Sequence, residues 1–109
     1  MATLYKVLGQ SAPAAETDTT LYTVPTATYA VVSTLSVCNR GVSATFRVAI
    51  RPNNATLANE HYIVYDNYVN AGDSVFLTLG ITMDAADVVT VRGGVSSQLT
   101  FSLFGSEIT

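Results

Sequence analysis

The chain has 109 residues, a length typical of one domain and sufficient for a core without metal or disulfide support. Hydrophobic residues make up 49% of it and charged residues only 12%, against the roughly 25% usual in soluble proteins. This composition excludes a disordered chain and indicates a largely neutral surface, suited to packing against another protein. The net charge of -3 and the dispersed basic residues argue against nucleic acid as a partner.

The first twenty residues predict a short strand followed by an arm. Residues 4–8 have the pattern of a strand, whereas residues 9–20 hold small and polar side chains that offer little to a core. We therefore expect residues 1–20 to form an N-terminal strand and flexible arm, and residues 21–109 to form one β-sandwich domain. No signal peptide and no apolar run of membrane-spanning length are present, so we expect synthesis in a cytoplasm and no membrane contact.

Residues 28–51 have the clearest strand pattern. In the run 44–51, Ala, Phe, Val and Ile alternate with Thr, Arg, Ala and Arg, as expected of a strand with one buried face. Residues 29–38 are rich in β-branched side chains, and we expect the single cysteine, Cys38, to be buried there. Asn39-Arg40-Gly41 suits a tight turn that needs positive φ angles, so the two runs predict a β-hairpin.

Further short strands follow the same pattern, with turn residues between them. Together they give about eight strands, with turn signals roughly every ten residues, which is typical of an antiparallel sandwich or barrel. We predict an all-β, antiparallel two-sheet β-sandwich of jelly-roll type, with an immunoglobulin-like sandwich as the alternative. The remaining expected strands are residues 21–24, 61–66, 74–81, 88–92 and 99–104.

No combination of side chains predicts an active site. His61 adjoins Glu60, but neighbouring strand residues point to opposite faces, and no nucleophile or second histidine lies at a matching position. We expect His61 to be structural and the protein not to be an enzyme. Aspartates beside turns, such as Asp84 and Asp87, do not follow a calcium-loop spacing and more often bond backbone amides. We therefore expect no metal and no cofactor.

Five residues form the candidate partner-contact surface. Arg47 and Arg51 share one strand face, Tyr62 and Tyr65 follow on the next expected strand, and Tyr68 comes just after it. Tyrosine is favoured at interfaces and can also stack on sugars, whereas two arginines on one face can bind a phosphate. Ordinary cross-strand packing is the competing interpretation, and the absence of tryptophan weakens a sugar-binding one.

Three segments together carry a likeness to a known family: residues 21–25 leading into 31–41, residues 45–52, and residues 99–105 ending at 107–109. This succession of strands and turns resembles the small structural proteins carried on tailed-bacteriophage particles, including those of cyanobacterial phages. The resemblance implies a compact β-sandwich that self-associates, often as a trimer. It also implies a role as a capsid decoration (cement) protein or as a neck, tail or fibre component.

We therefore expect a non-enzymatic virion structural protein, first of all a capsid decoration protein that stabilises the head. Its expected partners are copies of itself in a homotrimer and the major capsid protein or other virion proteins. Retention would come from many weak contacts on a repeating shell. The alternatives are a neck, tail or fibre component and a receptor- or carbohydrate-binding β-sandwich module. An enzyme whose site forms between subunits is a further, weaker alternative.

Overall fold

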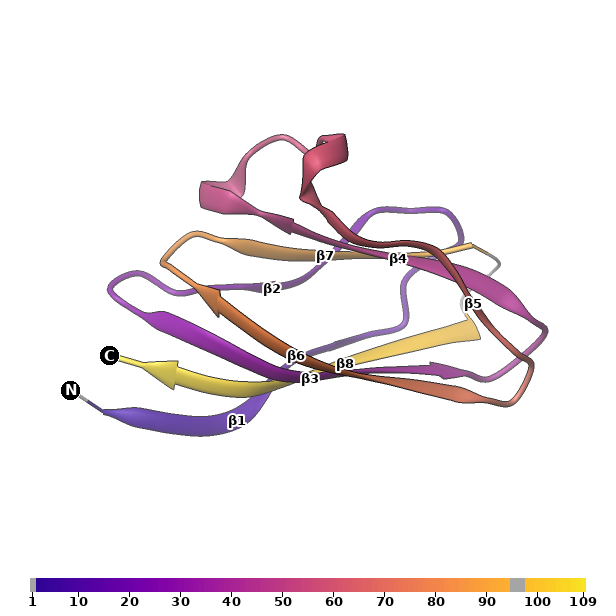
Figure 1. Cartoon of the computed structure of the whole chain (residues 1–109), viewed down its shortest axis with the longest axis horizontal. Helices are drawn as coiled ribbons and strands as arrows, with labels where there is room; N and C mark the ends of the chain where they lie inside the picture. The colour runs from indigo at the N-terminus through magenta and orange to yellow at the C-terminus, as the bar shows by residue number, and fades with distance from the viewer. Residues whose placement is uncertain (1, 95–97) are drawn as a thin grey trace.

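The computed structural model describes residues 2–94 and 98–109, and these residues form two antiparallel four-stranded sheets that pack face to face (Figure 1). Within this part of the chain, two short 3-10 helices, η1 (Pro52–Asn54) and η2 (Asn59–His61), follow the fourth strand. No helix of these residues is long and apolar enough to cross a bilayer. In chain order the strands are β1 (Thr3–Ser11), β2 (Thr19–Thr23), β3 (Tyr29–Asn39), β4 (Ala44–Arg51), β5 (Tyr62–Val69), β6 (Ser74–Met83), β7 (Val88–Gly93) and β8 (Leu99–Ile108).

The strand order identifies the sandwich as a jelly roll. One sheet has the order β1-β8-β3-β6 and the other β2-β7-β4-β5. The pairs β1·β8, β2·β7, β3·β6 and β4·β5 are those of one long antiparallel ribbon, and rolling this ribbon up adds the pairs β3·β8 and β4·β7. The predicted all-β, two-sheet sandwich is confirmed. Its strand order is not that of an immunoglobulin-like sandwich.

The core lies between the sheets and consists of the inward-facing residue of every second strand position. Phe46 of β4 and Phe101 of β8 meet across it, with ring centroids 6.1 Å apart in an edge-to-face arrangement. The predicted inward residues of β4 that are almost fully buried are Ala44, Phe46 and Val48. The other sheet contributes Val32, Leu35, Val37, Leu99, Phe101 and Leu103.

The predicted hairpin is wrong, because β3 and β4 belong to different sheets. Between them the chain turns a corner, and Asn39 holds this corner with its side chain. The Asn39 amide nitrogen donates to the carbonyl oxygens of Val42 (2.8 Å) and Val69 (3.1 Å), and its oxygen accepts from the amide of Gly41 (3.0 Å). Asn39 is only 1% exposed. An asparagine is therefore suited to this position because it bonds backbone groups in a buried corner, and not because it forms a hairpin turn.

A bulge in β3 decides which residues point outward. The register of β3 against β8 shifts between Val32 and Thr34, which pair with Gly105 and Phe104, so Ser33 is an extra residue relative to β8. Against β6 the extra residue is on β6, because Val32 and Thr34 pair with Ile81 and Thr78. After the shift Val37 points inward and Cys38 points outward, where it is half-buried. The expectation of a buried Cys38 is therefore wrong, because an inserted residue reverses the alternation.

The predicted division at residue 20 also fails, because the first strand is part of the sandwich. β1 pairs with β8 from Thr3 to Ser11, and residue 20 lies inside β2. Gly9 is needed here, because a Cβ atom at this position would lie 2.2 Å from the carbonyl oxygen of Leu21 in β2. The chain ends are tied together as well: Ala2 and Thr109 exchange backbone hydrogen bonds of 3.1 and 2.9 Å, and both termini lie at one corner (Figure 1).

Candidate functional site

The candidate partner-contact surface lies on the outer side of the sheet β2-β7-β4-β5, and its centre is a bulge in β5. Val64 and Asn67 of β5 pair with Val48 and Phe46 of β4. Two residues of β5 therefore lie opposite one residue of β4, which defines the bulge. Asp66 lies in this bulge with a φ of 51°, a left-handed conformation that Asp tolerates better than most residues. The bulge places the Asp66 carboxylate beside β4.

Arg47 of β4 holds this carboxylate with two parallel hydrogen bonds. Its Nε donates to Asp66 Oδ1 at 2.7 Å and its Nη2 donates to Asp66 Oδ2 at 3.2 Å. This fork matches the planar guanidinium to the planar carboxylate. The hydrogen bonds from Arg47 hold the pKa of Asp66 below its ordinary value of 3.8, and the same bonds raise the pKa of Arg47. Both groups therefore stay charged at neutral pH.

Two of the three predicted tyrosines join this ion pair. The guanidinium carbon of Arg47 lies 4.1 Å from the centre of the Tyr65 ring, a cation–π contact. Tyr62 and Tyr65 meet almost perpendicularly, with centroids 4.9 Å apart. Tyr68 is opposite Thr45 of β4 and, like Tyr65, is 59% exposed. The structure thus brings Tyr62 and Tyr65 together beside Arg47, and the binding of a partner by this surface stays a prediction.

Arg51 takes no part in this cluster. It lies at the far end of β4, where its Nε donates to Thr90 Oγ1 and its Nη1 donates to the carbonyl oxygen of Ala55, both at 3.0 Å. These bonds attach the loop between η1 and η2 to β7. Arg51 has a structural role here, and it is not brought together with Arg47.

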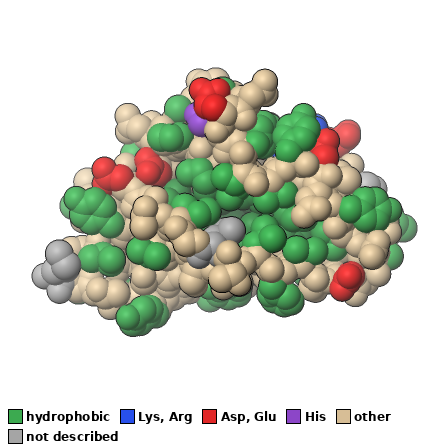
Figure 2. Space-filling model, in the orientation of Figure 1, with side chains coloured by type: hydrophobic (Ala, Val, Ile, Leu, Met, Phe, Trp, Pro, Cys, Tyr) green, Lys and Arg blue, Asp and Glu red, His purple; other side chains and the backbone are tan. Residues whose placement is uncertain are grey.

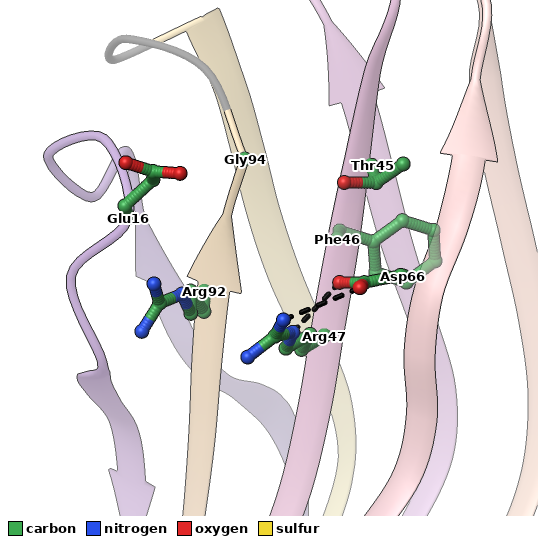
Figure 3. A pocket seen from close by; sticks show the side chains of 7 residues that line it. All are labelled: Glu16, Thr45, Phe46, Arg47, Asp66, Arg92 and Gly94. Atoms are coloured by element: carbon green, nitrogen blue, oxygen red, sulfur yellow. Dashed lines mark hydrogen bonds and ion pairs between the residues drawn. The ribbon is translucent and has the colours of Figure 1, made fainter.

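A pocket of about 140 Å³ adjoins Arg47, and residues of β4, β5 and β7 contribute to its lining (Figure 3). Its second arginine, Arg92 of β7, is the direct cross-strand partner of Arg47. Arg92 makes a longer ion pair with Asp18, whose Oδ1 is 3.8 Å from Arg92 Nη1. Arg92 could not be placed beside Arg47 from the sequence, because strand patterns do not tell which strand pairs with β4. The pocket is lined by Glu16, Thr45, Phe46, Arg47, Asp66, Arg92 and Gly94.

The opposite side of the sandwich has a different character. The four strands β1, β8, β3 and β6 contain only two charged residues, Lys6 and Glu107, and these bond each other at 3.0 Å. Glu107 is buried, so the outward side chains of these four strands are neutral, and we call this outer side the neutral face. Two cations approach it: Arg40, just after β3, donates to Thr100 Oγ1 at 2.9 Å, and Lys6 lines a hollow in this face. The hollow, of about 490 Å³, crosses the neutral face beside Tyr5 and Phe104. Its largest outward-pointing hydrophobic side chains are Tyr5, Val7, Tyr29, Val31, Phe76 and Phe104.

Figure 2 shows how unevenly charge is distributed between the two sides. Most of the charged side chains visible in this view lie in its upper half, over β4, β5, the loop of the two 3-10 helices and the turn between β6 and β7. Hydrophobic side chains fill the middle of the view, and they continue into the lower half, where β3 and β6 run. The surface is therefore divided rather than uniformly neutral.

A buried polar contact joins the two sheets behind the neutral face. The Tyr22 hydroxyl of β2 donates to Glu107 Oε2 of β8 at 2.5 Å, and Lys6 Nζ donates to Glu107 Oε1 at 3.0 Å. The bonds from Tyr22 and then Lys6 lower the pKa of Glu107 below its ordinary value of 4.5, whereas burial and Glu107 raise the pKa of Tyr22. One feature of the sequence indicates that Glu107 points inward: position 107 is in phase with the inward-facing positions 99, 101 and 103 of the same strand.

The residues weighed as catalytic or metal-binding make local bonds. His61 Nδ1 accepts from the amide of Ala58, the residue before η2, at 3.0 Å. Asp87 accepts from the amides of Asn53 (2.8 Å) and Asp84 (2.9 Å), and Asp84 accepts from the amide of Ala85 (2.7 Å). Among the residues that the structure describes, no three His, Cys, Asp or Glu side chains gather where they could hold a metal ion.

Comparisons with protein-family models, with curated proteins and with solved structures found no match to this chain. Its fold and surfaces are therefore the basis on which a function is proposed.

Proposed function

We propose that this protein is a non-enzymatic structural component of a bacteriophage particle, and that it associates with copies of itself and attaches to the shell as a capsid decoration (cement) protein. The observation that carries this proposal is the neutral face. The likeness of three segments to virion structural proteins and the jelly-roll fold are consistent with it.

The neutral face has the chemistry of a surface that is covered by protein. Tyr5 is 87% exposed and Phe76 is 68% exposed, although both are large hydrophobic residues. Contiguous exposed hydrophobic side chains on a folded chain usually mark a contact with another macromolecule. Because the outward side chains of its four strands are uncharged, most of the neutral face can pack against a neighbouring copy without the cost of burying an unpaired ion.

The size of the neutral face is sufficient for a stable contact. Its strands have nine to eleven residues, which at about 3.4 Å per residue and about 4.8 Å between strands gives roughly 600 Å² in projection. A standard protein interface takes about 800 Å² from each partner, and side chains add relief to the projected value. We therefore name a second copy of this chain as the occupant of the neutral face.

On a repeating shell such a subunit is retained by many contacts at once. A homotrimer attached at three points dissociates only when all three contacts open together, so weak individual binding to the major capsid protein is enough. The N-terminal residues 3–11 belong to β1, so attachment is assigned to the surface of the sandwich and not to a separate arm.

Solution mass tests self-association directly. Light scattering on a sizing column is expected to give a multiple of the 11.5 kDa of one chain, and three times this mass corresponds to the homotrimer. The assembled protein is then mixed with particles from which surface proteins have been stripped, and cosedimentation is expected. A protein that stays monomeric at high concentration and does not sediment with particles contradicts the proposal.

A second candidate function is a receptor- or carbohydrate-binding module, on a fibre or tail. It is favoured by one observation, the exposed rings of Tyr65 and Tyr68 beside the polar pocket. Binding to a glycan array that is lost in Tyr65→Ala and Tyr68→Ala supports this candidate. Array binding that both variants retain argues against it.

A further inference from the structure

The pocket beside Arg47 contains an arrangement of charges that the stability of the sheet does not explain. Across the outer side of the sheet β2-β7-β4-β5, four charged side chains follow in the order Asp18, Arg92, Arg47, Asp66, which we call the charged row. Each carboxylate lies at an outer end of the row. The two arginines are in the middle, directly opposite each other on β7 and β4.

Two like charges directly opposite each other on neighbouring strands destabilise a sheet. Cβ atoms of such a pair are about 5 Å apart, and long side chains can diverge only in part. Asp66 takes Nε and Nη2 of Arg47, and the other end of this guanidinium is turned towards Arg92 (Figure 3). Arg92 has a single ion pair among the described residues, with Asp18 at 3.8 Å, which is too long for a hydrogen bond.

An oxyanion placed between the two guanidinium groups would remove this repulsion. Arginine donates several N–H groups in one plane, a geometry that matches carboxylate, sulfate and phosphate groups. The pocket of about 140 Å³ is large enough for one such group and too small for a whole drug-sized ligand. The ligand would therefore insert only its charged group, and the rest of it would lie on the surrounding surface.

The surrounding surface favours a sugar over a peptide as the carrier of this group. Tyr65 stacks on Arg47, and Tyr68 is opposite Thr45, so both exposed rings adjoin residues that line the pocket. Flat aromatic rings next to convergent polar groups are suited to a pyranose ring that carries an acidic substituent. Glu16 opposes this binding, because its side chain lines the same pocket and carries a negative charge.

We infer that Arg47 and Arg92 form a binding site for the carboxylate or sulfate group of an acidic polysaccharide, with Tyr65 and Tyr68 beside its sugar rings. This site is on the sheet opposite to the neutral face, and the inference does not depend on self-association. Since one site takes one charged group, binding to a single sugar is weak and binding to a polymer is strengthened by multivalency.

The test uses the full chain and four polymers: polygalacturonate, dextran sulfate, neutral dextran and polyglutamate. Affinity is measured by biolayer interferometry at low and high salt. Wild-type protein is expected to bind at least one of the two acidic polysaccharides, and to bind it more weakly at high salt. The two acidic polysaccharides distinguish a carboxylate from a sulfate as the bound group.

Three variants separate the site from overall charge. Arg92→Gln removes one charge-assisted hydrogen-bond donor and is expected to weaken binding about tenfold. Arg40→Gln changes the net charge equally, but the Arg40 side chain bonds Thr100 on the other sheet, so its affinity is expected to stay within about twofold of wild type. Glu16→Gln removes the opposing charge from an exposed loop and is expected to strengthen binding.

Four results overturn the inference. These are no binding to either acidic polysaccharide, equal binding to neutral dextran, equal loss in Arg92→Gln and Arg40→Gln, and binding to polyglutamate that matches the acidic polysaccharides. The last result would assign the arginine pair to an acidic protein segment. Circular dichroism of each variant shows whether a loss of binding comes from unfolding, and the gain expected of Glu16→Gln cannot come from unfolding.

Discussion

The two outer sides of the sandwich are built on the same kind of sheet and carry opposite chemistry. The side of β1, β8, β3 and β6 is the neutral face, with large exposed rings such as Tyr5 and Phe76. The side of β2, β7, β4 and β5 carries the charged row, with an ion-paired arginine at its centre. Since outward residues do not take part in the core, each side can be specified without changing the fold.

The exposed edges of the two sheets differ in the same direction. β5, an edge of the charged side, is interrupted by the Asp66 bulge, and β2 is short and also bulged. β6, an edge of the neutral side, also has an extra residue against β3, between Thr78 and Ile81, but its ten residues include no charge and no proline. Bulges and charges at an edge prevent pairing with a second chain, and β6 lacks the charges. The neutral side is thus open to association at its edge as well as across its face.

The largest effect is expected where both sides depend on one residue. Phe101 is fully buried and contacts Phe46 of the other sheet, so Phe101→Ala leaves a cavity in the core between the two sheets. We expect a loss of about 3–5 kcal/mol in the free energy of unfolding. Urea unfolding followed by circular dichroism measures it. A loss below about 1 kcal/mol would show that the sheets are not held together by this layer.

The next largest effect is expected at Glu107, the buried carboxylate of β8. Loss of its charge should cost more stability than loss of an exposed charge on the other sheet. Glu107→Gln weakens two charge-assisted hydrogen bonds, from Tyr22 and Lys6, and is expected to cost about 1–3 kcal/mol at neutral pH. Because the folded protein lowers the pKa of Glu107, this contribution is complete above the ordinary value of 4.5 and is lost as the pH falls further.

The pH dependence of stability distinguishes a contribution from the charge of Glu107 from one that comes only from the packing of its side chain. The stability difference between wild type and Glu107→Gln is expected to be constant from pH 7 to about pH 5 and to shrink below that. Glu60→Gln, a change of the same type at an exposed residue of η2, serves as the matched control and is expected to leave stability almost unchanged. A difference that does not depend on pH would assign Glu107 to packing alone.

The third prediction tests the neutral face as an interface. Phe76→Glu places a charge among exposed hydrophobic side chains, and burying it against a second copy is unfavourable. We expect self-association to weaken at least about tenfold while the unfolding midpoint stays close to that of wild type. Tyr68→Glu is the control on the other side, at a similar exposure. Light scattering over a concentration series measures both, and equal weakening by the two variants would reject the neutral face as the contact.

The sequence predicted the jelly roll well because its signals are local. Alternation identified β4 and its buried side chains, and the turn residues separated the strands. Pairing was not local: Asn39-Arg40-Gly41 has the composition of a hairpin turn, yet it carries the chain from one sheet to the other. The bulge at Ser33 was invisible for a similar reason, since an inserted residue shows only when the neighbouring strands are known.

The candidate site was predicted in part for the same physical reason. The composition of β4 and β5 brought Arg47, Tyr62 and Tyr65 into one hypothesis, and the two strands are indeed neighbours. Arg92 and Asp18 come from β7 and the segment before β2, and only the rolling of the ribbon sets them beside Arg47. The alternation of side chains along a strand predicts which face of the sheet a residue is on. The charged residues that lie next to it depend on the strand order.

The smallest effect concerns Asp66, where a charge and a backbone conformation are combined. Asp66→Asn removes the charge of the fork with Arg47 but keeps a residue type that tolerates a φ of 51°. The pair is exposed and screened by solvent, so we expect a decrease in the unfolding midpoint smaller than that of Glu107→Gln. Asp66→Ala removes the fork and also the tolerance for left-handed backbone, so its decrease is expected to be the larger of the two. Thermal unfolding at low and high salt separates the contributions, because only the charge of the fork is screened.

If Asp66→Asn and Asp66→Ala lose the same amount of stability and the loss disappears at high salt, the bulge is maintained by the ion pair. If Asp66→Ala alone is destabilised at every salt concentration, the backbone of β5 sets the position of Asp66 and the charged row is a consequence of the bulge.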